Sequence, residues 1–205
     1  MNSKIIFDHI RGKLGGTQAQ YDALLRLLNA GAKVEDLAIF VGLSKEQVEP
    51  NVVQSKWALS QRSLDRLKGV HSDLVKVVKR AIEISEYDFM VVEGLRTKEK
   101  QAEYVKKGVS KTMNSYHLTG HAVDLAPLEH GAIDWNNSKG QFDAVAKAMK
   151  QAAKELGVSV EWGGVWQKSM LEYDNPQLES LNYVKQRKSK GLSAFIDKPH
   201  YQIQK

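Results

Sequence analysis

The spacing of apolar residues in this chain changes between residues 84 and 89, and this change limits the folds that the chain can adopt. Over residues 72–84, apolar side chains such as Leu74, Val77, Val78 and Ala81 recur at three- or four-residue intervals, as on a helix with one buried face. The following run, Phe-Met-Val-Val-Glu-Gly at 89–94, favours a short strand. The chain must therefore combine a sheet with helices that pack on it.

The rest of the C-terminal part repeats this mixture. Further helices are expected at residues 63–67, 97–107 and 142–156, and further strands at 121–126, 158–162 and 195–203. Pro127 is expected to end its strand, and Gly157 to end the long helix. Because the helices are grouped before and between a few short strands, we predict an α+β fold with a small, largely antiparallel sheet flanked by helices.

The first 52 residues are predicted to form a small all-helical module that precedes this domain. Helices are expected at residues 17–29 and 34–41 and from Ser44, and Pro50 closes the module. We place a linker at residues 53–60 and the main domain at 61–205. Two of the short helices resemble a helix-turn-helix, but the third offers a poor surface for phosphates, so we expect no nucleic-acid partner.

Composition excludes several classes of protein. The chain has 205 residues and no cysteine, so a metal ion would have to be bound by histidine and carboxylate. No apolar run approaches the roughly 18 residues that span a bilayer, and the first residues do not resemble a secretory signal. We therefore expect no membrane insertion and a protein that is first held in a cytoplasm. The formal charge of +6 suits a polyanionic partner, nucleic acid or a bacterial envelope, but is equally compatible with solubility alone.

A polar stretch interrupts the main domain between Trp166 and Phe195. It has only weak helical spacing, at Leu178, Leu181 and Val184. A long excursion of this kind is typical of a lid, a binding loop or a mobile segment.

Residues 115–124, Ser-Tyr-His-Leu-Thr-Gly-His-Ala-Val-Asp, hold the densest group of side chains suited to chemistry. Asp124 is expected to point away from the core of its strand, and His117 lies seven positions earlier, across a turn that Gly120 permits. Imidazole nitrogen and carboxylate oxygen are both zinc ligands. The candidate for a third ligand is His200, near the end of the last predicted strand.

The pattern Ser-x-His-x-x-Gly-x-Ala-x-Asp at 115–124, followed by Asp-x-x-His at 197–200, resembles the zinc peptidases of the D-Ala-D-Ala carboxypeptidase (LAS) group. It is most similar to the L-alanyl-D-glutamate endopeptidases that serve as phage endolysins. Further pieces agree in order and spacing, namely Tyr87-Asp-Phe, Glu93-Gly-Leu-Arg-Thr, Lys111-Thr-Met-Asn-Ser, Ile133-Asp-Trp and Glu161-Trp-Gly-Gly-x-Trp. The resemblance covers about residues 57–205 and implies a hedgehog/DD-peptidase-like fold.

The resemblance implies a zinc ion bound by His117, Asp124 and His200. It also implies that Asp197, three residues before the last ligand, is the general base, and Pro199 would stiffen the segment that joins the two. The carboxylate of Glu161 is the rival candidate for the base.

Three other residues are candidates for substrate binding. The resemblance assigns to Arg96 the anchoring of a substrate carboxylate, such as that of D-Glu. Ser115 would bind substrate or brace the site, and Gln101 would bind substrate or lie on the surface. Trp162 and Trp166 would line the cleft or pack in the core.

The function implied is that of a zinc-dependent hydrolase that cleaves peptide bonds in bacterial peptidoglycan, as a phage endolysin in host-cell lysis. Alternatives are a D-Ala-D-Ala carboxypeptidase or dipeptidase, and a non-enzymatic protein that binds cell wall or DNA. Such an endolysin would stay in the host cytoplasm until release and then act on the periplasm and cell wall. We expect a monomer whose N-terminal module binds the wall or serves as a spacer.

Two features depart from the family pattern. Val165 stands where related chains commonly have aspartate, and the stretch at 167–194 is longer than expected.

Overall fold

The computed structural model describes residues 56–137 and 139–203. The predicted N-terminal module and its boundary lie outside these residues, so both stay predictions. In chain order the elements are α5 (Gln61–Arg66), α6 (Ser72–Ile84), β1 (Phe89–Glu93), α7 (Lys98–Lys106), η1 (Tyr116–Thr119), β2 (Ala122–Glu129), β3 (Ala132–Ile133), α8 (Gln141–Leu156), β4 (Glu161–Trp162), β5 (Val165–Ser169), η2 (Met170–Glu172), α9 (Pro176–Ser189) and β6 (His200–Gln202), where η marks a 3-10 helix.

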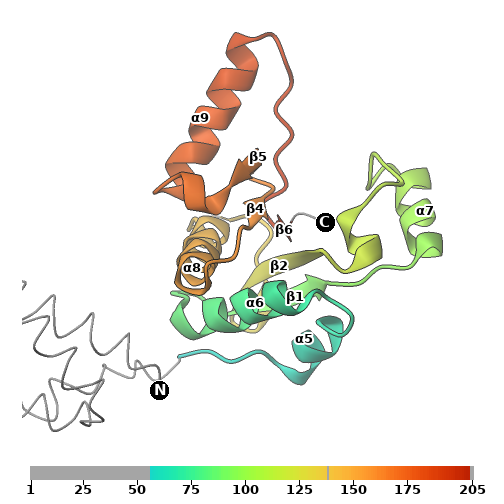
Figure 1. The fold of residues 1–205 in the computed structure, drawn as a ribbon, viewed down its shortest axis with the longest axis vertical. Coiled ribbons are helices and arrows are strands. Elements are labelled where there is room, and N and C mark those ends of the chain that lie inside the picture. The colour runs from blue at the N-terminus through green and yellow to red at the C-terminus, as the bar shows by residue number, and fades with distance from the viewer. Residues whose placement is uncertain (1–55, 138, 204–205) are drawn as a thin grey trace, which may run out of the picture. The chain divides into compact units, whose positions relative to one another are not determined.

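The strands form a sheet in the order β1-β2-β6-β4-β5, with β3 paired to β2 off this path, and every one of these pairs is antiparallel (Figure 1). The last strand, β6, lies between β2 and β4, so the C-terminal strand is in the middle of the sheet. Its register sets His200 opposite Asp124 and Tyr201 opposite Val123. These pairings confirm the predicted α+β fold with an antiparallel sheet.

The two faces of the sheet have different surroundings. Helices α6 and α8 pack together and cover one face with an apolar core. Fully buried side chains of this core include Leu74, Val78, Val123, Leu125, Met149 and Tyr201. Because successive residues of a strand point to opposite faces, Asp124 and His200 project from the face opposite these helices.

The second strand is longer than predicted, because Pro127 does not end it. Pro127 pairs with Phe89 of β1, and its carbonyl accepts a hydrogen bond from the N–H of Asp134. The pairing of β2 with β6 has already stopped at Asp124. The missing N–H of the proline therefore costs no bond to β6.

The last strand is shorter than predicted, and His200 begins it rather than ending it. Residues 197–200 form a turn, in which the N–H of His200 donates to the carbonyl of Asp197 at 3.0 Å. The N–H of Asp197 is bonded to the carbonyl of Gly163, and Pro199 has no N–H to offer a neighbouring strand. The strand expected at 158–162 is likewise reduced to Glu161–Trp162.

The polar stretch between Trp166 and Phe195 contains regular structure that the sequence analysis did not predict. It continues β5, forms η2, and then forms the helix α9, which extends away from the sheet (Figure 1). The side chain of Asn175 caps this helix by accepting a hydrogen bond from the N–H of Leu178. Leu178 and Leu181 are themselves exposed, which explains the weak helical pattern. Throughout the part of the chain that the structure describes, no helix has the length and apolar composition that a membrane span requires.

Candidate metal centre

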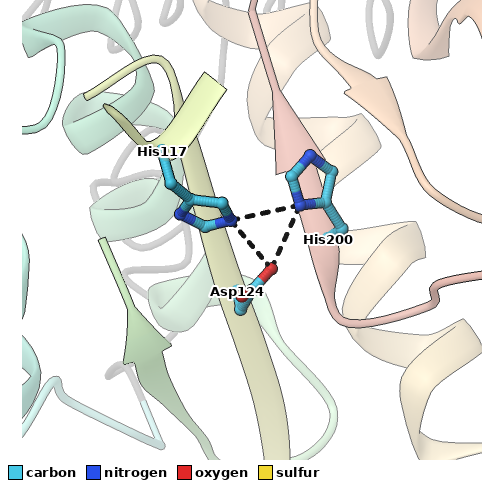
Figure 2. Close-up of side chains that lie close together, drawn as sticks. All are labelled: His117, Asp124 and His200. Carbon is cyan, nitrogen blue, oxygen red and sulfur yellow. Dashed lines mark hydrogen bonds and ion pairs between the residues drawn. The ribbon is translucent and has the colours of Figure 1, made fainter. Parts of the chain in front are cut away.

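His117, Asp124 and His200 come together on the face of the sheet opposite α6 and α8 (Figure 2). His117 lies in η1, and Gly120 ends that turn in the left-handed conformation that glycine favours. Asp124 and His200 are direct partners on β2 and β6. His117 Nε2 lies 3.3 Å from His200 Nδ1 and 3.3 Å from Asp124 Oδ1, and the latter two atoms are 3.1 Å apart.

These separations suit one metal ion. Nitrogen and oxygen ligands of a tetrahedral ion lie about 2.0–2.1 Å from the ion and therefore about 3.3 Å from one another. Within residues 56–137 and 139–203, these three side chains are the one group of histidines and carboxylates close enough to hold a metal. Three protein ligands would leave a fourth position open for water or substrate, as in catalytic rather than structural centres.

The ring of His117 is fixed through its other nitrogen. Nδ1 lies 2.8 Å from the carbonyl oxygen of Gly94, which can only accept a hydrogen bond. Nδ1 therefore carries a proton, and in a neutral ring the lone pair of Nε2 would face the other two candidate ligands. Gly94 has no room for a side chain, because a Cβ atom there would lie 2.1 Å from the carbonyl oxygen of Arg66.

Electrostatics keep Asp124 ionised. Burial opposes ionisation, but the hydrogen bonds and charges of His117 and His200 outweigh it and hold the pKa of Asp124 well below its usual range. For His200, burial favours the neutral ring, but the contact with Asp124 outweighs this and raises the pKa of His200. The second carboxylate oxygen of Asp124, Oδ2, lies 3.6 Å from Arg96 Nη2.

Arg96 and Gln101, two of the predicted substrate-binding residues, are both buried and bonded to protein groups. Arg96 donates from Nη2 to Glu93 Oε2 at 2.5 Å and from Nη1 to Gln101 Oε1 at 2.7 Å. The amide nitrogen of Gln101 donates in turn to two oxygens of the 110–112 loop. Gln101 therefore does not lie on the surface. Arg96 contacts Asp124 through the carboxylate oxygen that does not face the two histidines. Contact of either side chain with substrate stays a prediction.

Ser115, the third predicted substrate-binding residue, braces the site in this structure. It is the N-cap of η1, and its hydroxyl accepts a hydrogen bond from the N–H of His117 at 3.3 Å. This contact fixes the start of the turn that carries His117.

Asp197 lies in the turn that precedes β6. Burial and the nearby charge of Asp124 raise the pKa of Asp197, and the positive charges of the two histidines and Arg96 only partly oppose this. The carboxyl group of Asp197 therefore lies within the electrostatic field of the three candidate ligands. The rival carboxylate, Glu161, lies on β4 opposite Gln202 and lines a pocket with Gln202, Tyr116 and Lys168.

The two tryptophans play different parts. Trp162 is fully buried, and its indole N–H donates to the carbonyl of Lys198 at 2.8 Å, so this side chain belongs to the core. Trp166 is only partly buried; its ring centroid lies 5.4 Å from that of His200 and 5.8 Å from that of Phe195. Trp166 therefore forms a wall beside the candidate metal centre.

Glu93 and Gln202 also lie at this site, although no prediction from the sequence included them. An irregularity in β1 between Val91 and Glu93 brings Glu93 opposite Asp124. No pattern in the sequence indicates this irregularity. Gln202 Oε1 lies 3.0 Å from His200 Nε2. Its position two residues after His200 on a strand was a usable signal, because such residues share a face.

An antiparallel sheet with helices on one face carries on its other face a His-Asp-His group that could hold a metal ion, an arrangement that suits a hydrolase. The comparisons with known proteins agree. The family model of the phage L-alanyl-D-glutamate peptidase matches residues 55–182, a range that includes His117 and Asp124 but stops before Asp197 and His200. The chain belongs to this family of peptidases.

Three relatives support the assignment. The L-alanyl-D-glutamate peptidase of Escherichia phage T5 is 42% identical over 112 residues, which are 53% of this chain and 81% of that protein. The L-alanyl-D-glutamate peptidase of Listeria phage A118 is 33% identical over 125 residues, which are 60% of this chain and 41% of that protein. The crystal structure of the Serratia marcescens L-Ala D-Glu endopeptidase ChiX superposes with a TM-score of 0.54 and 34% identity, covering 75% of this chain and 94% of that one.

Proposed function

We propose that this chain is a zinc-dependent endopeptidase that hydrolyses the bond between L-alanine and D-glutamate in the peptide stems of bacterial peptidoglycan. The observation that carries the proposal is the convergence of two imidazole nitrogens and a carboxylate oxygen at 3.1–3.3 Å from one another in a chain of this family. Two imidazole nitrogens and a carboxylate oxygen, in a protein without cysteine, are a donor set that suits catalytic zinc.

In this proposal His117, Asp124 and His200 hold the zinc ion. When bound, zinc would acidify the attacking water and polarise the scissile carbonyl. Asp197 accepts the proton of that water and later delivers it to the leaving amine. In the metal-free site, burial and the charge of Asp124 raise the pKa of Asp197.

The predicted substrate-binding residues act in this proposal through the ligands they support. Arg96 holds Asp124, Gln101 holds Arg96, and Ser115 holds the backbone of His117. Direct contact of Arg96 with a substrate carboxylate is a further prediction; its Nε has no hydrogen-bond partner among the described residues. Trp166, beside His200, supplies an apolar wall for the bound peptide.

The biological role that we propose is that of a phage endolysin. The protein would remain in the host cytoplasm until release and then degrade peptidoglycan, and we expect it to act as a monomer. Two similar proteins come from phages, which supports this role. No contact among the described residues favours the carboxypeptidase alternative.

Removal and return of the metal test the proposal. The protein is stripped with a chelator and assayed on a soluble stem peptide that contains the L-Ala–D-Glu bond. Activity should disappear and should return with one equivalent of zinc. Undiminished cleavage by protein shown to be free of metal would refute the zinc mechanism, and cleavage only at a D-Ala-D-Ala end would support the carboxypeptidase alternative.

A further inference from the structure

Gln202 lies beside the candidate metal centre but has no part in the mechanism proposed above. It is on β6, the strand between β2 and β4, and it pairs with Ala122 on one side and Glu161 on the other. Its side chain shares a face with that of His200. Both residues are 8% exposed, so their polar atoms need partners within the protein.

The contact between these two side chains determines which nitrogen of His200 is free. Gln202 Oε1 lies 3.0 Å from His200 Nε2. An amide oxygen only accepts hydrogen bonds, so this contact requires the proton of a neutral ring to be on Nε2. The acceptor on the other side of the ring, Asp124 Oδ1, is itself a proposed ligand and would share the metal with Nδ1. The lone pair is then on Nδ1, which lies 3.1 Å from Asp124 Oδ1 and 3.3 Å from His117 Nε2.

The surroundings of the amide favour this orientation. With its oxygen turned to His200, the amide nitrogen of Gln202 is left for the other side, where Gln202 lines a polar pocket of about 520 Å³. Glu161 and Tyr116 line the same pocket, and the side chains of both are of types that can accept hydrogen bonds. A reversed amide would put the proton of His200 on Nδ1 and turn the lone pair away from the other ligands.

We propose that Gln202 is a positioning residue that holds His200 in the tautomer that presents Nδ1 to the metal. The inference rests on the zinc site of the proposed function. Gln202 itself touches neither metal nor substrate. Gln202 accepts a hydrogen bond from the ring nitrogen of His200 that does not face the metal, as the carbonyl of Gly94 does for His117. Because the acceptor is a side chain, it can be changed by mutation.

Zinc affinity measured against a competing chelator tests this proposal in three variants. Gln202→Leu removes the acceptor at similar volume and should weaken zinc binding about 10–100-fold. Gln202→Glu keeps an acceptor oxygen on a side chain of the same length and should bind zinc within a few-fold of the parent. Gln141→Leu is the control: Gln141, the first residue of α8, is also buried, but its amide is bonded to Asp134, and its replacement should leave zinc affinity unchanged.

Nitrogen NMR of the zinc-loaded parent protein gives a second readout that needs no variant, and it decides the matter should Gln202→Leu fail to fold. We expect the proton of His200 on Nε2 and the metal on Nδ1. The opposite assignment, or a Gln202→Leu protein that binds zinc as tightly as the parent, would overturn the proposal. A parent protein that binds no zinc would instead overturn the proposed function together with this inference.

Discussion

At the scale of single residues, each of the three candidate ligands is held by a further protein group. These groups are the Gly94 carbonyl, the Arg96 guanidinium and the Gln202 amide. Such contacts fix the direction of the donor atoms before a metal arrives, so less ordering is needed on binding. Zinc binding is therefore expected to respond to loss of a candidate ligand far more than to loss of a nearby histidine outside this group.

Replacement of His117 by alanine tests this expectation. His117→Ala should lose both bound zinc and peptidase activity, because two ligands do not retain the ion at catalytic affinity. Metal analysis after dialysis, together with an activity assay, measures both. The matched control is His121→Ala: His121 is bonded to Thr119 and lies beside His71, so this variant should keep its zinc.

Replacement of Asp197 by asparagine separates the base from the ligands. Asp197→Asn should bind zinc normally but lose about 10²–10⁴-fold in kcat, the usual contribution of a general acid–base group. Near-normal turnover in the zinc-loaded variant would transfer the role to Glu161 or another group. Loss of zinc would show instead that Asp197 is needed to build the centre.

At the scale of elements, the turn at residues 197–200 is central because it joins the proposed base to a proposed ligand. Neighbouring groups hold it at several points. The carbonyl of Gly163 accepts from the N–H of Asp197, the indole of Trp162 donates to the carbonyl of Lys198, and the ammonium of Lys198 is paired with Asp143 of α8 at 2.7 Å. The Trp-Gly-Gly sequence thus has a structural purpose, which is to bring this turn against β4.

Gly163→Ala tests the role of this packing. A Cβ atom at Gly163 would lie 2.1 Å from the carbonyl oxygen of Asp197, so the turn would have to move. Zinc affinity and kcat should both fall, as measured by chelator competition and peptide hydrolysis. Gly131→Ala, where a Cβ meets nothing within 4 Å but the φ of +81° is unfavourable, should lower thermal stability and leave zinc binding intact. Equal effects of the two variants would contradict the account.

The same elements show what the sequence could and could not predict. The helix at 72–84 has the predicted bounds because its apolar period is strong, whereas α9 was missed because Leu178 and Leu181 face solvent. The predicted end of β2 was wrong because a proline interrupts a strand only where its missing N–H would have bonded to a neighbouring strand. Whether such a neighbour is present at Pro127 depends on the tertiary structure. The convergence of the three candidate ligands followed from motif spacing, but Glu93 joins them through an irregularity in β1 that no sequence pattern indicates.

At the scale of the whole molecule, every candidate site residue belongs to one compact unit that begins after residue 53. The predicted module at residues 1–52 therefore contributes no proposed ligand or base. Deletion of residues 1–52 should leave zinc content and cleavage of soluble stem peptides intact. Lysis of sedimented cell walls should fall, because a tethered enzyme sees a higher effective substrate concentration. Loss of soluble activity in a folded truncated protein would contradict the wall-binding or spacer role.

The most direct test of the account is mass spectrometry of purified peptidoglycan digested by the zinc-loaded protein, with chelator-treated protein as the control. Cleavage of the L-Ala–D-Glu bond should give peptides with D-glutamate at the N-terminus and glycan strands that retain L-alanine. Neither product should appear in the control. Release of terminal D-alanine alone, or an identical fragment pattern with and without metal, would contradict the account.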